Sequence, residues 1–357
     1  MIYFRADANE NIGLGHVMRC LALADGFRAL GKECLFILAS DTKNDAIITQ
    51  RGYSFVRLTN GYLEMAKEAE ELQKILSDPE AIFIVDSYFV PDGYEEFVKR
   101  IIAGRGRYIC FDDEMNKAFA ADGLINYNLY ADAKRYEQIY LAHNLPLPKL
   151  YLGGDYIPLR TDIEELSDEL RVKTPEDGRL NVLLSCGGAD PEGVTVRFLR
   201  FLKEEGNFPG TEKFVFHIPV GAVNAAKEQI YALAENMPCV KLYGHISPFR
   251  AFIRQMDLAV SAAGSTLYEL CMEGIPTVTY VLADNQKELA GKFERLGLMP
   301  FAGDCRGNED FVRDLLNLLR KLSERNDLDD LRKKMRKTVD GLGAKRLAEE
   351  ILKDNRG

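Results

Sequence analysis

Short apolar runs alternate with amphipathic helical stretches along most of this chain, and this alternation limits the folds that it can adopt. In the first half, the apolar runs are MIYFRA, CLFILAS, SFVRL, AIFIVDS and RYICFDD. Helical patterns lie between several of them. In the first pattern, Val17, Leu21 and Ala24 share one helical face, and Gly31 is placed to end the helix. Strand, helix and strand at these spacings predict a parallel β-sheet with helices on both faces.

The alternation breaks once and then restarts. Residues 156–179 are charged and contain two prolines, which is typical of a linker. Strand-like runs and helical patterns then alternate again, beginning with LNVLLSCGG. We therefore predict an α/β protein with Rossmann-like doubly wound domains over 1–155 and 180–325, followed by a helical tail over 326–357. Two such domains are expected to face a cleft, with ligands at the carboxyl ends of the strands.

Composition excludes some classes of partner. A chain of 357 residues exceeds one ordinary core, in agreement with two domains. The net charge of −9 argues against nucleic-acid and membrane-surface partners, because both need a basic face. A phosphate-bearing small ligand remains compatible, since backbone N–H groups and a helix N-terminus can hold it.

Compartment is indicated by what the sequence lacks. It shows no signal peptide and no apolar run near the ~20 residues of a membrane span. The seven cysteines form no C-x-x-C pair and are interpreted as free thiols in a reducing compartment. We therefore expect a cytoplasmic protein; its oligomeric state does not follow from these features.

The loop after the first predicted strand, RADANENIGLGHVMR, holds polar and flexible residues. Gly13 and Gly15 allow the backbone to turn sharply and to approach a ligand. His16 follows at the predicted start of a helix, where the helix dipole favours an anion. The spacing provides G-x-G but lacks the third glycine of a dinucleotide fingerprint. Two interpretations are open: a ligand or catalytic site, and a helix-start histidine bonded to a nearby backbone group.

The second domain begins with a similar loop, SCGGADP. Gly187 and Gly188 follow a strand and precede a helix. Asp190 before Pro191 predicts an N-cap with proline at the first helical position. A diphosphate could bind to the N–H groups of this loop. The alternative, a tight strand-to-helix turn, is the commoner interpretation of an isolated Gly-Gly pair.

The segment SAAGSTLYELCMEGIP is more informative. Gly264 ends a predicted strand, and Ser265 and Thr266 begin a helix, which turns their hydroxyl and N–H groups toward a ligand. Glu269 lies one turn further, where a carboxylate can bind both hydroxyls of a ribose. A solvated helix glutamate is the alternative, and the apolar neighbours of Glu269 argue against it.

Polar residues end other predicted strands. LADNQ places Asn285 and Gln286 at the same edge of the second sheet, and IVDSY places Asp86 and Tyr88 at a strand end of the first.

Asp112 and Asp113 also follow a strand. Paired aspartates occur at metal sites, but a third ligand at a suitable spacing is missing, so a helix-capping or loop-holding role is favoured. No metal is expected.

Three other histidines are isolated in the sequence. His143 and His217 are predicted to be structural. His245 lies in YGHIS, a turn that could bind a base.

These motifs together resemble one family. The stretch RADANENIGLGHVMRCLALA resembles the N-terminal signature of the pseudaminic-acid-pathway UDP-sugar hydrolases and their spore-coat-polysaccharide relatives. VDSY, FDD, CGGADP, SAAGSTLYELCMEGIP and ADNQ follow in the family's order, to about Leu298. The GG and GS-T-x-x-E elements are shared with the wider group of two-domain glycosyltransferases that includes the peptidoglycan N-acetylglucosamine transferase.

The resemblance implies a fold of the GT-B type and a metal-independent, cofactor-free reaction. That reaction is hydrolysis of UDP-2,4-diacetamido-2,4,6-trideoxy-β-L-altropyranose, with inversion, in pseudaminic (nonulosonic) acid biosynthesis. The catalytic residues are expected at His16, Tyr88 and Asn285. The remaining expected contacts are substrate contacts at Asp7, Gly13, Gly15, Arg19 and Gln286, and nucleotide contacts at Gly187, Gly188, Ile246, Gly264, Ser265, Thr266 and Glu269.

The chemistry of these residues agrees with that expectation. Inversion needs a base that deprotonates water on the face opposite the leaving group, and a neutral imidazole suits that task. Asp7 and Asp86 are both candidates to orient His16, and the sequence does not choose between them. Two alternatives stay open: a glycosyltransferase that uses a UDP-sugar donor, and a non-catalytic protein that binds sugar nucleotides.

Overall fold

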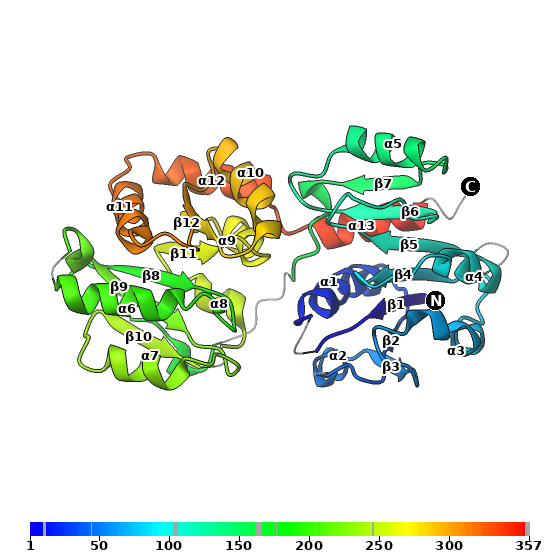
Figure 1. The fold of residues 1–357 in the computed structure, drawn as a ribbon, viewed down its shortest axis with the longest axis horizontal. Helices are drawn as coiled ribbons and strands as arrows, with labels where there is room; N and C mark the ends of the chain where they lie inside the picture. The colour runs from blue at the N-terminus through cyan, green and yellow to red at the C-terminus, as the bar shows by residue number, and fades with distance from the viewer. Residues whose placement is uncertain are drawn as a thin grey trace. The chain divides into compact units, whose positions relative to one another are not determined.

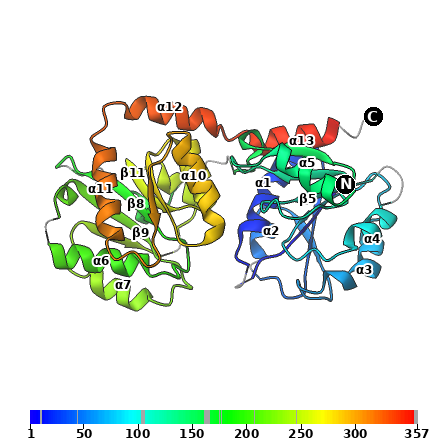
Figure 2. The same cartoon turned by 45° about the horizontal axis from the view of Figure 1, so that its top comes forward.

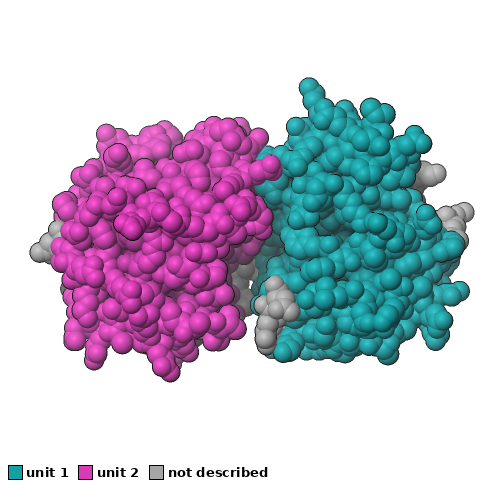
Figure 3. All heavy atoms as spheres, viewed as in Figure 1, with its two compact units in different colours: residues 1–161, 341–357 teal, residues 162–340 magenta. Residues whose placement is uncertain are grey.

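The computed structural model describes residues 1–9, 12–43, 45–102, 106–160, 166–173, 175, 177–206, 208–244 and 246–353. Contacts between residues divide the chain into two compact units (Figure 3). Unit 1 comprises Met1–Thr161 and Gly341–Gly357, and unit 2 comprises Asp162–Asp340. Each unit contains its own parallel sheet and its own helices, so the predicted pair of doubly wound α/β units is confirmed.

The described part of unit 1 forms a seven-stranded sheet in the order β3-β2-β1-β4-β5-β6-β7 (Figure 1). The order reverses between β1 and β4, which makes this pair the topological switch point. All five residues of β4 are buried, because both faces of the parallel sheet are covered. The strands are β1 (Ile2–Ala6), β2 (Cys34–Leu38), β3 (Ser54–Arg57), β4 (Ile82–Asp86), β5 (Arg107–Phe111), β6 (Gly123–Asn126) and β7 (Lys149–Leu152).

Helices cover both faces of this sheet. Tyr3 and Phe83 point to the face that packs with Tyr94 of α4 and Tyr136 of α5. Phe4 points to the opposite face, where the helix α1 packs. The helices of unit 1 are α1 (Gly15–Ala29), α2 (Ala46–Gln50), α3 (Ala69–Ile75), α4 (Tyr94–Ile101), α5 (Ala133–Ala142) and α13 (Gly343–Lys353).

The described part of unit 2 forms a six-stranded parallel sheet in the order β10-β9-β8-β11-β12-β13. Its switch point lies between β8 and β11, in the place that corresponds to β1 and β4 of unit 1. The strands are β8 (Leu180–Ser185), β9 (Phe214–Pro219), β10 (Val240–Tyr243), β11 (Leu258–Ala262), β12 (Thr277–Val281) and β13 (Phe301–Asp304).

The helices of unit 2 also lie on both faces of its sheet (Figure 2). Phe252 of α8 and Leu270 of α9 pack with Leu183 and Ala259 of the sheet. Phe198 of α6 packs on Phe216 of β9 from the other face. The helices are α6 (Val194–Glu205), α7 (Lys227–Ala234), α8 (Phe249–Ile253), α9 (Thr266–Glu273), α10 (Lys287–Arg295), α11 (Phe311–Ser323) and α12 (Leu328–Thr338).

The C-terminal helical segment is divided between the two units, whereas the sequence predicted one separate tail over 326–357. The helix α12 packs on α9 in unit 2, where Arg332 Nη1 donates to the carbonyl of Gly274 at 3.1 Å. The helix α13 packs along α1 in unit 1. Apolar residues on one face of each helix find different partners, and this separates α12 from α13.

The predicted linker also differs in part from the structure. Leu166, Leu170 and Val172 pack on the core of unit 2, and Val172 N donates to Gln255 Oε1 at 2.8 Å. The second part of the segment 156–179 therefore belongs to unit 2.

Several short elements were not expected from the sequence. The strands β6, β7 and β13 have only four residues each, and a period of two over four residues is a weak signal. No helix in the described residues is long and apolar enough to cross a membrane.

Candidate active site

Four polar residues predicted in the first half meet at the switch point of unit 1: His16, Arg19, Asp86 and Tyr88. The loop that follows β1 leads into the helix that carries His16, and Asp86 is the last residue of β4. These strands are neighbours, and Ala6 pairs with Asp86 in their register. Because α1 begins at Gly15, His16 lies in its first turn, as predicted. The parallel sheet therefore brings together two side chains that are 70 residues apart in sequence.

His16 and Asp86 form a buried pair, with 2.6 Å between Nδ1 and Oδ1. Burial opposes ionisation of Asp86, but Arg19 and His16 beside it hold the pKa of its carboxyl well below the usual range. An ionised carboxylate only accepts hydrogen bonds, so a neutral imidazole here carries its proton on Nδ1. Nε2 is then free of a proton, and it has no hydrogen-bond partner among the described residues.

This geometry shows which group His16 contacts, and its catalytic role stays a prediction. A helix-start histidine bonded to a backbone group was one of the two interpretations of His16, and the structure shows a side-chain carboxylate instead. A buried imidazole that is oriented on one nitrogen and unoccupied on the other can act as a general base.

Arg19 lies one turn further along α1 and connects the pair to the next strands. Its Nε and Nη2 donate to the two oxygens of Asp86, each at 2.5 Å. Its Nη1 donates to Asp113 Oδ2 at 2.7 Å and to Tyr127 Oη at 3.1 Å. Protein acceptors engage these N–H groups, and Arg19 thereby links Asp86 to Asp113. The substrate contact expected at Arg19 stays a prediction.

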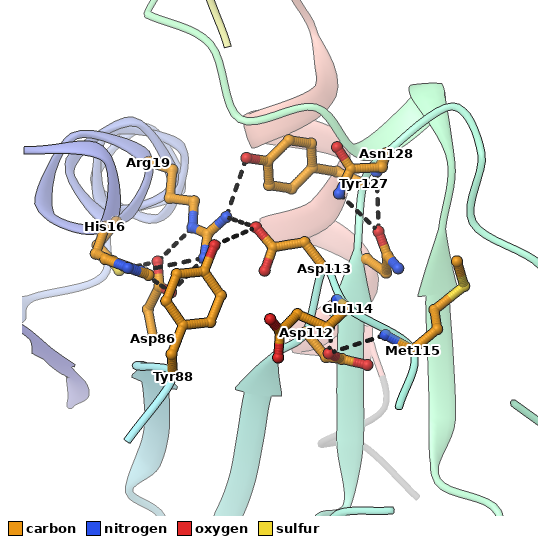
Figure 4. A network of polar contacts seen from close by, with 12 residues as sticks. His16, Arg19, Asp86, Tyr88, Asp112, Asp113, Glu114, Met115, Tyr127 and Asn128 are labelled. Carbon is orange, nitrogen blue, oxygen red and sulfur yellow. Dashed lines mark hydrogen bonds and ion pairs between the residues drawn. The ribbon is translucent and has the colours of Figure 1, made fainter. Parts of the chain in front are cut away.

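Tyr88 joins the same network through its ring and its hydroxyl (Figure 4). Its ring meets the His16 imidazole edge-on, with 4.8 Å between the ring centroids. Its hydroxyl donates to Asp113 Oδ2 at 3.1 Å. The Tyr88 side chain is 52% exposed, so an incoming ligand can reach it. The structure therefore brings Tyr88 and His16 together, as the resemblance implied.

Asp7, predicted to contact the substrate or to orient His16, has other partners. Its carboxylate binds Arg5 and accepts from Ala39 N and Thr42 Oγ1, each at 2.7 Å. The residue is buried. Between the two aspartates proposed to orient His16, the structure selects Asp86, because only its oxygen contacts the imidazole in the described residues.

The two glycines of the first loop differ in their roles. Gly13 has φ +72°, a region that favours glycine, and its N–H donates to Asn9 O at 2.9 Å. Gly15 begins α1 without a positive φ. A Cβ at either position would meet no atom within 4 Å. Open space beside both backbones is consistent with the predicted approach of a substrate.

Asp112 holds a loop, as favoured in the sequence. Its carboxylate accepts from Tyr136 Oη at 2.7 Å. It also accepts from the N–H groups of Glu114 and Met115 at 3.0 and 3.3 Å (Figure 4). Within the described residues, no cluster of three or more His, Cys, Asp or Glu side chains could hold a metal ion.

Two loops of unit 2 flank its switch point, as two loops flank that of unit 1. Gly187 and Gly188 follow β8 and are exposed. Gly187 has φ +78°, which favours glycine. The helix α6 begins at Val194 and not at Pro191, so the predicted helix start is three residues early. Asp190 still caps it, because its carboxylate accepts from Val194 N and Thr195 N at 2.8 and 2.9 Å.

The second loop of unit 2 runs from β11 into α9. Ser265 is the N-cap residue and Thr266 the first residue of α9, as predicted. Gly264 N donates to Ala262 O at 2.8 Å, so the N–H groups of Ser265 and Thr266 are the ones at the start of α9 toward which an anion is attracted. Glu269 lies in the first turn. Burial raises the pKa of Glu269 to about 7, although Arg250 lowers it. In its ionised form this carboxyl accepts hydrogen bonds only, and the ribose contact expected at Glu269 stays a prediction.

The loop that carries Asn285 and Gln286 is held from several sides. Gln286 Oε1 accepts from Leu282 N at 3.0 Å, so this oxygen is used inside the loop. Asp284 accepts from Arg306 Nη2 at 2.7 Å and contacts Lys287. Asn285 between them is exposed. This arrangement holds the backbone beside Asn285 and leaves its amide available.

The remaining predicted residues are placed as follows. Ile246 is half-buried and packs against the unit 2 core. His143 contacts Ile139 O at 2.8 Å, and His217 lies between Asn181 Oδ1 and Tyr243 Oη at 2.9 and 2.7 Å. Both predicted structural histidines therefore contact groups of the protein. His245 lies outside the described residues.

Asp113 and Tyr127 are the parts of the network that the sequence analysis missed. The FDD motif did mark the end of β5, but its second aspartate was interpreted as a loop residue. Only the order β4-β5-β6 places Asp86, Asp113 and Tyr127 within reach of one guanidinium.

Comparisons with known proteins agree with this fold and with the motifs. No protein-family model matches the chain. It is 23% identical over 294 residues to the spore coat polysaccharide biosynthesis protein SpsG of Bacillus subtilis, over 82% of this chain and 80% of that protein. It is 24% identical over 197 residues to the UDP-2,4-diacetamido-2,4,6-trideoxy-beta-L-altropyranose hydrolase of Campylobacter jejuni, over 55% of this chain and 63% of that protein. The resemblance predicted from the motifs is therefore confirmed at low identity, and the match spans less than two thirds of the hydrolase.

A solved structure supports the fold over the whole chain. The crystal structure of Arabidopsis thaliana UGT89C1 complexed with UDP has a TM-score of 0.72 and 11% identity, covering 100% of this chain and 99% of that one. At this identity the likeness describes the fold alone. The predicted GT-B type with two Rossmann-like units is confirmed.

Proposed function

We propose that this chain is a sugar-nucleotide enzyme that hydrolyses UDP-2,4-diacetamido-2,4,6-trideoxy-β-L-altropyranose to UDP and the free sugar. Its place would be the cytoplasm, in pseudaminic acid biosynthesis for polysaccharide or flagellin glycosylation. The proposal draws on the named hydrolase and spore-coat relatives and on the motifs that they share with this chain. The proposed reaction requires a base and a group that holds the diphosphate, and it requires no metal.

The observation that carries the proposal is the contact between His16 Nδ1 and Asp86 Oδ1 at 2.6 Å. It leaves Nε2 as the acceptor for a proton of water. Water that loses this proton attacks the anomeric carbon, and the bond to the diphosphate oxygen breaks with its electron pair on UDP. Asp86 then stabilises the imidazolium, because an ionised carboxylate beside it favours the charged form.

The diphosphate would bind to unit 2. N–H groups at Gly187, Gly188 and the start of α9 can donate hydrogen bonds to its oxygens, since a helix N-terminus and open backbone N–H groups attract anions. Glu269 is proposed to bind the ribose, and Tyr88 and Asn285 to contact the sugar.

The first experiment measures release of UDP from the proposed donor by the full chain. His16→Ala should lower kcat by about 10²–10⁴-fold, the usual contribution of a general base. His143→Ala is the matched control, because His143 is an exposed histidine of the same unit. Turnover near the wild-type rate in His16→Ala would show that His16 is not the base, and NMR of the fresh product would show whether the configuration inverts.

Glycosyl transfer is the second candidate, and the aromatic surface beside His16 favours it. Phe89 is 38% exposed and meets Tyr62 edge-on, with 5.1 Å between centroids, next to the exposed Tyr88. Exposed aromatic rings can bind an acceptor. An assay with and without candidate acceptors separates the two reactions, because hydrolysis proceeds without one. Tight UDP binding without turnover on any donor would instead favour a non-catalytic binding protein.

A further inference from the structure

The carboxylate of Asp113 lies in the network around His16, although it does not contact the imidazole. Its Oδ2 accepts from Arg19 Nη1 at 2.7 Å and from Tyr88 Oη at 3.1 Å. Its Oδ1 is buried and has no hydrogen-bond partner among the described residues. A buried carboxylate oxygen without a hydrogen-bond partner is costly. Hydrogen bonding by this oxygen therefore does not explain why a carboxylate stands at this position.

The balance of charges in the network explains the carboxylate of Asp113. Arg19 forms a bidentate contact with Asp86, and its Nη2 donates to the same Oδ1 that contacts His16. If Asp86 were the only carboxylate, its charge would be balanced by Arg19, and an imidazolium at His16 would add an unbalanced positive charge. With Asp113 present, two carboxylates face one guanidinium and leave one negative charge beside the neutral imidazole. Protonation of His16 then makes the cluster neutral.

The surroundings keep these charges effective. The Arg19 guanidinium lies 5.0 Å from the ring centroid of Phe111, and its side chain is 11% exposed. Water therefore screens it only weakly. The other titratable groups that face the pair are Cys20, whose Sγ donates to Asp86 Oδ2 at 3.7 Å, together with Tyr88 and Tyr127. Burial raises the pKa of the Cys20 thiol, so this group stays neutral.

We propose that Asp113 is a positioning residue that neutralises Arg19, so that the charge of Asp86 remains available to stabilise protonated His16, and that it holds Tyr88 against the imidazole. The proposal deepens the proposed function and rests on it where His16 acts as the base. The placement of charge itself can be tested without any substrate.

The test follows the imidazole of His16 by NMR during a pH titration of the full chain. The chain has four histidines, and the signal that is missing from His16→Gln identifies His16. In Asp113→Asn, the titration midpoint of His16 should move to lower pH by about one unit, because one nearby negative charge is lost. Tyr88→Phe keeps the charge of Asp113 and should leave the midpoint where it is in the wild type.

Glu114→Gln is the matched control. Glu114 is exposed, adjacent in sequence, and has no contact with His16, Arg19 or Asp86 in the described residues. It removes one negative charge and should not move the midpoint. A folded Asp113→Asn variant with an unchanged midpoint overturns the proposal. Should this variant not fold, Asp113→Ser is the second test, and failure of both to fold overturns the proposal as well, because Asp113 is then needed for the fold.

Kinetics separate this proposal from the proposed function. If the wild type releases UDP, Asp113→Asn should lower kcat by about tenfold with a small change in KM, and move the acid limb of the kcat profile to lower pH. A shifted midpoint without hydrolysis by the wild type supports the role of Asp113 and rejects the reaction. Hydrolysis with an unshifted midpoint rejects the role of Asp113 alone.

Discussion

Asp86 is the residue on which the contacts of the unit 1 site converge. One oxygen contacts His16 and Arg19, and the other contacts Arg19 and Cys20. These contacts hold the pKa of its carboxyl well below the usual range in spite of burial. A carboxyl group with a lowered pKa stabilises the fold at neutral pH, and this contribution is lost only as the pH falls below about 4. Near neutrality Asp86 therefore offers His16 a full negative charge.

The first prediction at the residue scale is that Asp86→Asn impairs both activity and stability. Because an amide cannot stabilise an imidazolium as a carboxylate does, kcat should fall by about 10²-fold or more. Loss of one partner from a buried ion pair should lower the free energy of unfolding by about 3 kcal/mol. Steady-state kinetics and urea unfolding measure the two effects. Asp92→Asn, at a fully exposed carboxylate, should change neither; wild-type kcat in folded Asp86→Asn would contradict the proposed role.

At the scale of the element, two hydrogen bonds of one histidine link three strands of unit 2. His217 of β9 lies between Asn181 of β8 and Tyr243 of β10. Burial, with a smaller effect of Lys241, lowers the pKa of His217 to about 4. The unfolded chain binds a proton there near pH 6.5, whereas the folded chain does so only near pH 4. Stability is therefore lost as the pH falls from about 6.5 to 4, and the loss is complete below that range.

The second prediction follows from this difference. Between pH 6.5 and 4, the free energy of unfolding of the wild type should fall by roughly 3 kcal/mol more than that of His217→Gln. Urea unfolding at several pH values measures the slope in both proteins. His143→Gln is the control, because His143 is exposed on α5 and should leave the slope unchanged. Equal slopes for the wild type and His217→Gln would show that His217 does not titrate in this range.

At the scale of the whole molecule, the helix α13 follows unit 2 in sequence but belongs to unit 1. The helix α13 packs on α1, the helix that carries His16. A Cβ on Gly26 of α1 would lie 2.6 Å from Ala344 O, which shows how closely the two backbones approach. Leu347 and Ile351 are fully buried. Unit 1 thus depends on residues that follow unit 2 in sequence.

The third prediction is that Leu347→Ala destabilises unit 1. Removal of a fully buried leucine side chain should lower its free energy of unfolding by about 2–5 kcal/mol. Circular dichroism during urea unfolding measures this as an earlier transition. Leu141→Ala is the matched control, because Leu141 belongs to the same unit and is 82% exposed. Identical transitions for Leu347→Ala and the wild type would show that α13 contributes little to unit 1.

The sequence by itself determined the two doubly wound units and the loops that carry the candidate residues. Long apolar runs and helical periodicity depend on local spacing, and a glycine loop before a helix start is visible wherever it occurs. For this reason the sequence predicts His16, Gly187, Ser265 and Asn285 as candidate residues. The short strands β6, β7 and β13 could not be predicted, because four residues carry too little periodicity.

Only the tertiary structure decided which residues become partners. Asp7 and Asp86 both follow strands, and the pairing of β1 with β4 selects Asp86 for His16. The order of β4, β5 and β6 places Asp113 and Tyr127 on Arg19, and the faces of α12 and α13 divide the C-terminal segment between two units. The physical reason is that hydrogen bonds and ion pairs join residues about 70 to 108 positions apart, so their partners are set by strand order and not by local spacing.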